Sequence, residues 1–250
     1  SVFFWKLRFM KHWMLFLLVL SLTPLQGQEN EVTAVEIPEV RDSLGQILDP
    51  RYREDQFYLG MNFNLLMNFP EGVSQNGLSY GLQGGFIRDF PLNADCTFAL
   101  GVGIGYGFNS YYSNLRALES GDGIEYVILT DSDTYKRNKL ETHLIEVPLE
   151  LRWRNSTRET FKFWRIYGGA KFGYIVGSRS KYVTNEFVDS FNNSDTGNFT
   201  YGLTLNVGYN TFNLHFYYGL NSLFEDGVNG PDGQQLEMSV LRLGLIFYIL

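Results

Sequence analysis

The feature that most constrains this sequence is a two-residue alternation in which one face is large and apolar and the other is nearly empty. Residues 97–108 read TFALGVGIGYGF. Successive side chains of a β-strand point to opposite faces, so this strand would carry only Thr, Ala and Gly on one of its faces. A strand of a soluble protein would have polar residues opposite its apolar ones. The pattern therefore predicts a strand whose apolar face meets lipid and whose small face lines a narrow barrel.

The same alternation recurs along the chain from Gln56 onward. Each repeat covers about 9–14 residues, the length that a tilted strand needs to cross the hydrocarbon of a membrane. We therefore predict an all-β protein, an eight-stranded antiparallel transmembrane up-and-down β-barrel. For the second strand, the alternation leaves open which face points inward. The expected strands cover residues 57–65, 79–89, 97–108, 145–153, 165–176, 199–208, 212–219 and 241–249.

The connections between these strands alternate in length. The long ones cover residues 113–138, 177–198 and 221–237, the one at 66–78 is intermediate, and the short ones cover 90–95, 154–162 and 209–212. Transmembrane barrels have tight turns on the periplasmic side and long loops outside, which fits this alternation. The alternative is a soluble lipocalin-like barrel, but that fold would hide its large residues and expose its charges.

The two faces of the expected strands carry different chemistry. Charged residues in the strands share the small face, and an ionised side chain facing lipid at mid-depth would cost about 2–4 kcal/mol. Because an eight-stranded lumen is filled by side chains, we expect a salt-bridged plug and not an open pore. The expected lumen network is Glu146, Glu150, Arg152, Arg165, Lys171, His215 and Arg242; the lumen glycine row is Gly101, Gly103, Gly105 and Gly107; the lipid-facing set is Phe98, Leu100, Val102, Ile104, Leu243, Leu245 and Phe247.

The first part of the chain differs from everything after it. Residues 1–27 carry Lys6, Arg8 and Lys11 before a short apolar stretch, the order of a cleaved secretory signal peptide. An uncleaved membrane anchor is the alternative, although the apolar stretch is short for a span. Residues 28–55 are acidic and are predicted to form a flexible periplasmic leader, so that the barrel occupies 56–250. Loss of three basic residues with the signal peptide would take the net charge from −7 to −10.

Composition excludes several classes of function. Aromatic residues make up 16% of the chain and charged residues 19%, which argues against disorder. The negative net charge offers no basic field for nucleic acid, so no nucleic-acid partner is expected. The single cysteine, Cys96, cannot form an intramolecular disulfide or a cysteine-rich metal site. We expect no cofactor and no metal.

Three segments resemble a known family. His143 to Leu151 reads HLIEVPLEL, residues 167–169 read YGG, and residues 217–221 read YYGLN. These segments are similar to those of the outer-membrane β-barrel proteins of Bacteroidetes, often described as porin-family or PorT-family proteins. The resemblance implies a barrel in the outer membrane of a Gram-negative bacterium, in contact with outer-membrane lipid and lipopolysaccharide. It carries over no catalytic residues, and one family member is associated with type IX secretion and gliding.

Several functions remain open at this point. The leading hypothesis is a small non-enzymatic barrel with a structural, adhesive or partner-binding role, which implies an envelope protein partner. The alternatives are an accessory part of type IX secretion, a passive small-solute porin, and a lipid A-modifying enzyme. An enzyme would need a triad such as His143, Glu146 and Ser110 or Ser113 within hydrogen-bond reach. Alternation places His143 on the lipid side and Glu146 on the lumen side, which disfavours that triad.

Overall fold

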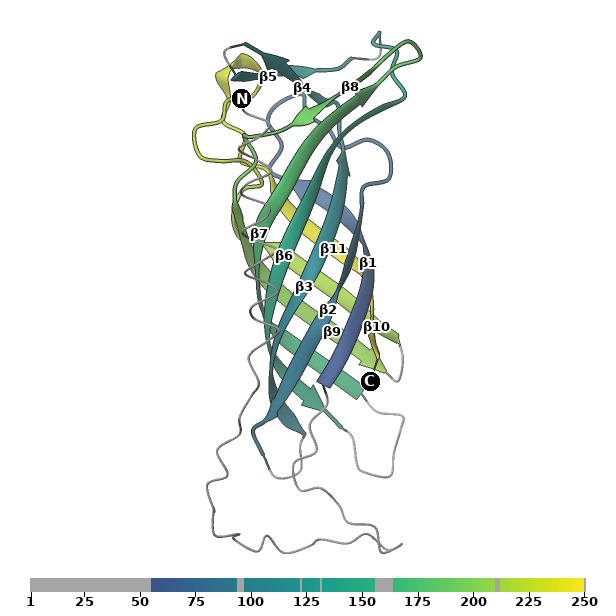
Figure 1. Ribbon diagram of the computed structural model, residues 1–250, viewed down its shortest axis with the longest axis vertical. Coiled ribbons are helices and arrows are strands. Elements are labelled where there is room, and N and C mark those ends of the chain that lie inside the picture. Colours follow the sequence, from purple (N-terminus) through teal and green to yellow (C-terminus); the bar gives the residue numbers. More distant parts are fainter. Residues whose placement is uncertain are drawn as a thin grey trace, which may run out of the picture. The chain divides into compact units, whose positions relative to one another are not determined.

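A computed structural model of the chain describes residues 55–93, 97–121, 123–130, 132–155, 164–209 and 212–249. The signal peptide predicted for 1–27, and all but the last residue of the predicted leader, lie outside these ranges. In the described part, eight strands close into an antiparallel barrel, which confirms the predicted fold (Figure 1). They are β1 (Asp55–Met67), β2 (Tyr80–Pro91), β3 (Phe98–Tyr112), β6 (Arg137–Arg154), β7 (Trp164–Val183), β9 (Phe199–Tyr209), β10 (Phe212–Gly219) and β11 (Ser239–Ile249).

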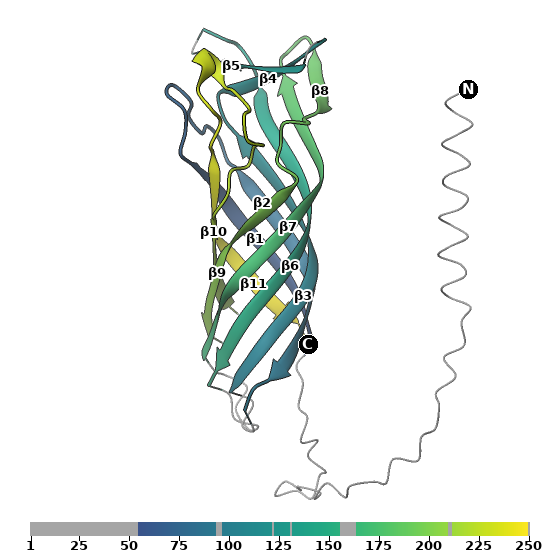
Figure 2. The same cartoon turned by 90° about the vertical axis from the view of Figure 1, so that its left-hand side faces the viewer.

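Each barrel strand pairs with the next one along the chain, and β1 pairs with β11 to close the ring. The pairing is up-and-down throughout, since β3 pairs with β6 and β7 pairs with β9. Closure gives every strand two neighbours, so the backbone N–H and C=O groups at membrane depth are satisfied within the sheet. Figure 2 shows the tilted strands from the side.

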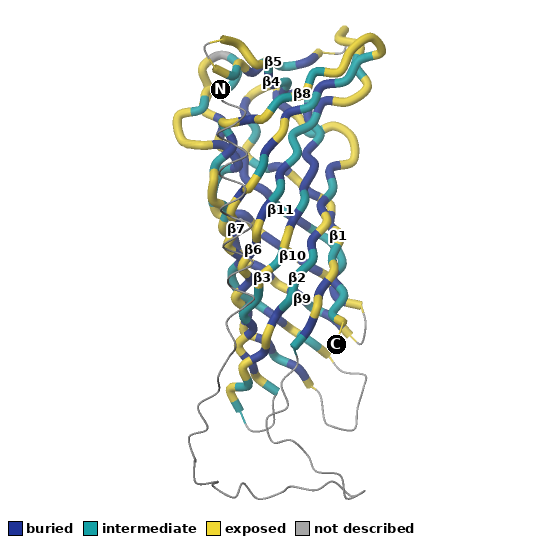
Figure 3. Tube along the Cα trace, viewed as in Figure 1, coloured by how far each residue is buried: buried dark blue, intermediate teal, exposed yellow. Residues whose placement is uncertain are grey.

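Exposure alternates along the strands, as the bands in Figure 3 show. In β1, Phe57, Leu59 and Met61 are 61%, 57% and 58% exposed, whereas Tyr58 between them is 2% exposed. The apolar side chains face outward and the small or polar ones face the lumen. This polarity is the reverse of a soluble barrel and is what a lipid environment requires.

The glycine row of β3 makes room for large side chains that enter the lumen from the nearby strands β1, β2 and β6. A Cβ on Gly101 would lie 2.7 Å from Arg152 Cδ, and one on Gly107 would lie 3.1 Å from the Glu146 carboxyl carbon. A Cβ on Gly105 would overlap the hydroxyl of Tyr58. One on Gly103 would meet Ile87 of β2 at 2.6 Å. The empty face of β3 is therefore the space into which the charged and aromatic lumen side chains project.

Two barrel strands, β6 and β7, extend farthest beyond the lengths that the sequence pattern predicts, and two predicted loops contain strands. β6 has 18 residues and β7 has 20, because they continue beyond the other strands at one end of the barrel. A hairpin of β4 (Leu115–Ser120) and β5 (Gly123–Ile128) lies within the predicted loop 113–138. β8 (Val188–Asn192) pairs with the extension of β7. The outward positions of these extensions are polar, so the sequence of the extensions resembles that of a solvated loop.

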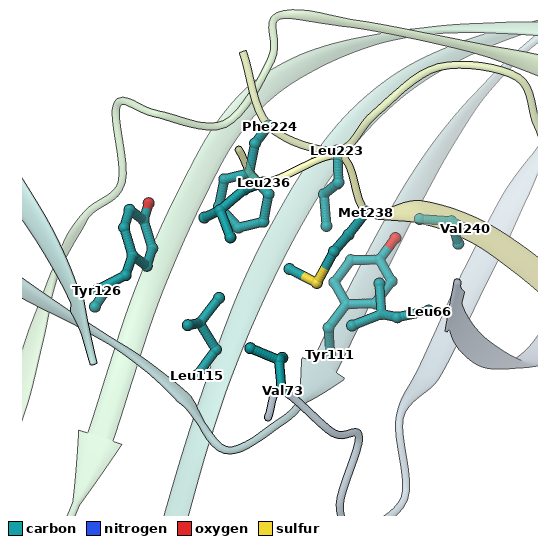
Figure 4. Close-up of a cluster of buried hydrophobic side chains, with 11 residues drawn as sticks. Leu66, Val73, Tyr111, Leu115, Tyr126, Leu223, Phe224, Leu236, Met238 and Val240 are labelled. Carbon is teal, nitrogen blue, oxygen red and sulfur yellow. The ribbon is translucent and has the colours of Figure 1, made fainter. Parts of the chain in front are cut away.

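These segments form a folded unit that we call the crown. It comprises the loop 68–79, the β4–β5 hairpin, β8, the extensions of β6 (137–143) and β7 (177–183), and the loop 220–238 with the short 3-10 helix η1 (Pro231–Gly233). The crown packs on a hydrophobic core that it shares with the ends of β1, β3 and β11 (Figure 4). The buried members of this core are Leu66, Val73, Tyr111, Leu115, Ala117, Tyr126, Leu223, Phe224, Leu236, Met238 and Val240.

Candidate functional site

The lumen holds ion pairs in successive layers, beginning with one centred on Arg152. The Arg152 guanidinium donates to Asp89 and, at 2.9 Å, to the side-chain oxygen of Gln56. Arg154 lies 3.3 Å from the same aspartate. The Arg152 guanidinium also stacks over the Tyr167 ring, 3.9 Å from its centroid. Asp89 is fully buried and neutralises cations that come from a different strand.

A second layer links Glu150 to His215 through an asparagine. Asn206 Nδ2 donates to Glu150 Oε1 at 3.0 Å, which leaves the asparagine oxygen facing His215. His215 Nδ1 lies 2.6 Å from that oxygen. Because an amide oxygen can only accept, His215 Nδ1 carries the proton in this arrangement. Arg152 Nε lies 3.5 Å from Glu150 Oε2 and connects this layer to the first.

The third layer places one carboxylate between two cations. Glu146 Oε1 accepts from Arg242 at 3.0 Å, and its Oε2 lies 3.3 Å from Lys171 Nζ. The side chains of all three residues are at most 4% exposed. Lys171 also donates to Gln83, and the Arg242 guanidinium lies over the Tyr217 ring at 4.4 Å. The three groups therefore form one buried charged cluster in the lumen, with two cations around one carboxylate.

The sequence-predicted lumen residues are distributed over these layers with one exception. Arg165 is half-buried at the turn end of β7, opposite Arg154 in the β6–β7 register. Sequence reasoning missed Asp89, Arg154, Gln56, Gln83 and Asn206. The usable signal for two of them was the odd-numbered positions of β2, which carry Gly81, Gln83, Gly85 and Asp89 but also the apolar Ile87.

Little space remains between these side chains. A cavity beside Arg242, lined also by Tyr111 and Tyr217, has a volume of about 10 Å³. Another, in the crown beside Leu115 and Tyr126, has about 20 Å³. Each is about the size that one water molecule needs. These two cavities are therefore too small to hold a solute larger than water.

The predicted lipid-facing residues lie on the outer face of β3 and β11. Phe98, Leu100 and Ile104 are exposed at 51%, 37% and 59%. Val102 and the three residues of β11 are half-exposed: Leu243, Leu245 and Phe247. Their neighbours across the register are other apolar side chains, such as Phe63 opposite Leu243.

The residues of the hypothetical triad are not brought together. The His143 Nδ1 hydrogen-bonds with the Tyr106 hydroxyl on the outer face, and its ring lies 5.1 Å from that of Phe108. Glu146 lies inside the barrel. Within the described ranges, no three His, Cys, Asp or Glu side chains are grouped to hold a metal ion. No helix among the described residues is both long and apolar enough to span a membrane.

Polar contacts hold the crown together around its apolar core. The Arg116 guanidinium of β4 lies 3.7 Å from the ring centroid of Tyr182 on β7 and 3.6 Å from the Asp189 carboxylate on β8. Asn193 Nδ2 bridges Tyr126 of β5, at 3.1 Å, to Ser180 of β7, at 2.9 Å. Burial raises the pKa of Tyr126 above its usual value, so this phenol stays neutral. These contacts therefore hold the β4–β5 hairpin against the β7–β8 pair.

β8 has a second edge that no described strand covers. Thr184 N donates to Phe187 O and Asn193 N donates to Ser178 O, which fixes the hydrogen-bonded pairs of this hairpin. Hydrogen-bonded and non-hydrogen-bonded pairs alternate in an antiparallel ladder. The backbone groups of Val188, Ser190 and Asn192 consequently point away from β7.

The comparisons with known proteins agree with this architecture. The family model described as outer membrane protein beta-barrel domain matches residues 28–225, and the chain belongs to this family. It is accordingly a protein of the outer membrane. No curated protein matches the sequence.

Among solved structures, the chain is similar to Ail, the attachment invasion locus protein of Yersinia pestis. That match has 12% identity and a TM-score of 0.34, and covers 78% of this chain and 97% of Ail. A second structure of Ail, in complex with the heparin analogue sucrose octasulfate, matches at 13% identity and a TM-score of 0.32, covering 78% and 99%.

Proposed function

We propose that this chain is a non-enzymatic outer-membrane protein whose sealed barrel anchors a crown that binds an envelope or extracellular partner. The observation that carries the proposal is the hydrophobic core of the crown. Loops that only connect strands have no need to bury Leu236, Met238 and Tyr126 at 1%, 2% and 8% exposure. A packed core fixes the outer surface of the crown in one shape, which lowers the entropic cost of binding.

The filled lumen supports an anchoring role over passive transport. The layers around Arg152 and Glu146 occupy the interior, and a solute would have to displace buried ion pairs to pass. The separation of His143 from Glu146 by the barrel wall supports a non-enzymatic role over lipid modification. The general role of the barrel is therefore to present the crown, and not to conduct solutes or to modify lipids.

The free edge of β8 is the best candidate for the contact itself. Its outward backbone groups at Val188, Ser190 and Asn192 can pair with an extended segment of a partner, as in other cases where a strand is added to a sheet. The Val188 side chain is 62% exposed beside this edge, and Phe187 is 50% exposed at the turn. Main-chain pairing would provide affinity, and these apolar side chains would provide selectivity.

The finer predictions from the sequence are part of this proposal. The segments HLIEVPLEL and YYGLN support kinship with the Bacteroidetes porin-family or PorT-family proteins, and residues 1–27 support export with a cleaved signal peptide. An accessory role in type IX secretion is the variant of partner binding that this kinship suggests.

Site-specific photocrosslinking in native membranes tests the proposal. A crosslinking amino acid at Ser190 should yield a discrete adduct that is absent when the same residue is placed at Leu92, an exposed position in the turn at the opposite end. Loss of the adduct on Val188→Pro, which disrupts edge pairing, would support strand addition. Equal adducts from Ser190 and Leu92, or no adduct from any crown position, would contradict it.

A further inference from the structure

The outer face of β6 and β7 carries charged residues immediately above the apolar belt. Outward positions alternate with the buried Asn138, Thr142, Ser178 and Ser180. In the β6–β7 register, Glu141 lies opposite Arg179, Lys139 opposite Lys181, and Arg137 opposite Val183. We call the four cations Arg137, Lys139, Arg179 and Lys181 the basic patch.

The height of the basic patch follows from the strand geometry. Trp153 at the turn end of β6 and His143 are ten residues apart, about 33 Å along the strand. At the tilt of such strands this corresponds to about 25 Å across the membrane, the height of an apolar band. Each further pair of residues adds about 5 Å, so Arg179 and Lys181 lie about 5 to 10 Å above His143. That is the layer of lipid headgroups.

An aromatic boundary separates the basic patch from the hydrocarbon layer. Tyr106, Phe108 and His143 are in contact on the outer face, with His143 bonded to the Tyr106 hydroxyl. A register shift between His143 and Leu144 interrupts the regular β6–β7 pairing at this level. Amphipathic aromatic side chains prefer the interface between lipid and water. The change from Ile145 to His143 to Glu141 therefore follows the change from acyl chain to headgroup.

The basic patch has an unbalanced charge. Lys139 pairs with Glu141, and these two side chains are only 8% and 18% exposed. Burial lowers the pKa of Lys139, but the hydrogen bond to Glu141 and its charge more than offset this, so the pKa lies above its usual value. Glu141 is the one carboxylate on these outward positions of β6 and β7, against four cations. Asp189, on the adjacent β8, pairs with Arg116 in the crown, and Glu186 lies in the turn beyond β7.

Lys139 and Lys181 are placed directly opposite each other across the strand pair. The β-carbons of directly opposite residues are about 4.5–5.5 Å apart, and like charges at such positions destabilise the pairing. An anion between Lys139 and Lys181 would lower this electrostatic repulsion. An anion at this place must approach from the membrane side, because the other side of both strands packs on the buried face of the crown.

We propose that the basic patch binds the phosphate-bearing headgroup of an outer-leaflet lipid. The exposed Arg179 and the half-buried Lys181 supply charges that the headgroup can reach, Lys139 supplies a positioned one, and the aromatic boundary below contacts the first part of the acyl chains. The lipid stabilises the membrane-proximal base of the crown. The proposal concerns the outer face of the barrel, so it is independent of which partner the crown binds.

Native mass spectrometry of the full-length protein released from nanodiscs tests this proposal. The nanodiscs contain phosphatidylcholine with either monophosphoryl lipid A or its dephosphorylated form. The wild-type protein should retain the phosphorylated lipid preferentially. The variant R179Q/K181Q should retain about 25-fold less, at about fivefold for each charge removed. R88Q is the matched control, because Arg88 is an outward cation on the turn side of the barrel, paired with Asp55.

Three results would overturn the proposal. One is equal retention of the two lipids by the wild-type protein, which requires no variant to fold. Another is an equal loss in R88Q and R179Q/K181Q, which would mean that net charge and not the patch governs retention. The last concerns free phosphate: if excess inorganic phosphate removes the preference and binds detergent-solubilised protein with the same dependence on Arg179 and Lys181, the ligand is not a lipid. Gel migration with and without heating verifies that each variant is folded.

Discussion

Replacing Glu146 by Gln is expected to destabilise the barrel by about 3 kcal/mol. Glu146 is the carboxylate between Arg242, at 3.0 Å, and Lys171, at 3.3 Å. The amide keeps the shape of the side chain but removes its charge, so both cations lose their counter-ion inside a closed lumen. Breaking a buried ion pair by removing one partner costs about 3–5 kcal/mol, because the remaining charge stays desolvated.

The lower end of that range applies because each cation keeps another contact. Lys171 still donates to Gln83, and Arg242 still lies 4.4 Å above the Tyr217 ring. Adding Lys171→Met removes one of the two remaining charges, and E146Q/K171M should recover about half of the loss. Such recovery from a second substitution would identify charge imbalance, and not a packing defect, as the cause.

Urea titration of protein refolded into phospholipid vesicles measures the effect, with tryptophan fluorescence and gel migration as readouts. Asp55→Asn is the control, since the Asp55–Arg88 pair at 2.8 Å has side chains 34% and 49% exposed. An exposed pair of this kind contributes about 0–1 kcal/mol. If E146Q costs no more than D55N, the lumen charges are hydrated, and the argument for a packed plug is refuted.

Three other perturbations have defined outcomes. Gly105→Ala places a methyl group on the Tyr58 hydroxyl and should cost about 1–3 kcal/mol by urea titration, with partial recovery when Tyr58→Phe removes that oxygen. Leu236→Ala should open the crown to limited proteolysis, because Leu236 is 1% exposed in the crown core. The heat-dependent gel migration of the barrel should stay unchanged. Leu220→Ala is the control and should have no effect, since Leu220 is 50% exposed. The backbone N–H of Thr130 lowers the pKa of Asp133 below its ordinary value of 3.8. The turn that joins Thr130 to Asp133 is therefore fully stabilised above pH 3.8, and this stabilisation is lost as the pH falls through the lower folded-state pKa. An Asp133 titration by NMR with its midpoint at or above 3.8 would disprove this.

The membrane-spanning part of the fold was predictable because lipid leaves few alternatives. A strand in hydrocarbon must be apolar outward, and a narrow lumen must be small or paired inward, so residues 97–108 determine both faces. β2 was ambiguous for a physical reason. Its outward Arg88 lies at the turn end beside Asp55, where water or headgroups solvate it, while the inward Asp89 is neutralised by Arg152. Because the adjacent residues Arg88 and Asp89 are both charged but point to opposite faces, this end of β2 shows no alternation of apolar and polar residues.

The crown and the pairing within the lumen were not predictable from local patterns. Beyond the membrane, the outward positions of β6 and β7 are polar, so the sequence of residues 177–183 resembles that of a solvated loop. Only the pairing with β8 shows that these residues form a strand. The lumen contacts depend on the register of the closed barrel. Glu146 and Arg242 are 96 residues apart in the sequence, and only closure of β1 on β11 places them at one level. Sequence alternation identifies the lumen residues but not their partners.

Conductance of the folded wild-type protein in planar lipid bilayers is the most direct test of the central claim, that paired side chains close the lumen. The packed layers around Arg152, Glu150 and Glu146 predict an electrically silent membrane at potentials that leave the bilayer intact. Stable, reproducible conductance steps that scale with salt concentration would mean that ions pass through the barrel, and would contradict the account.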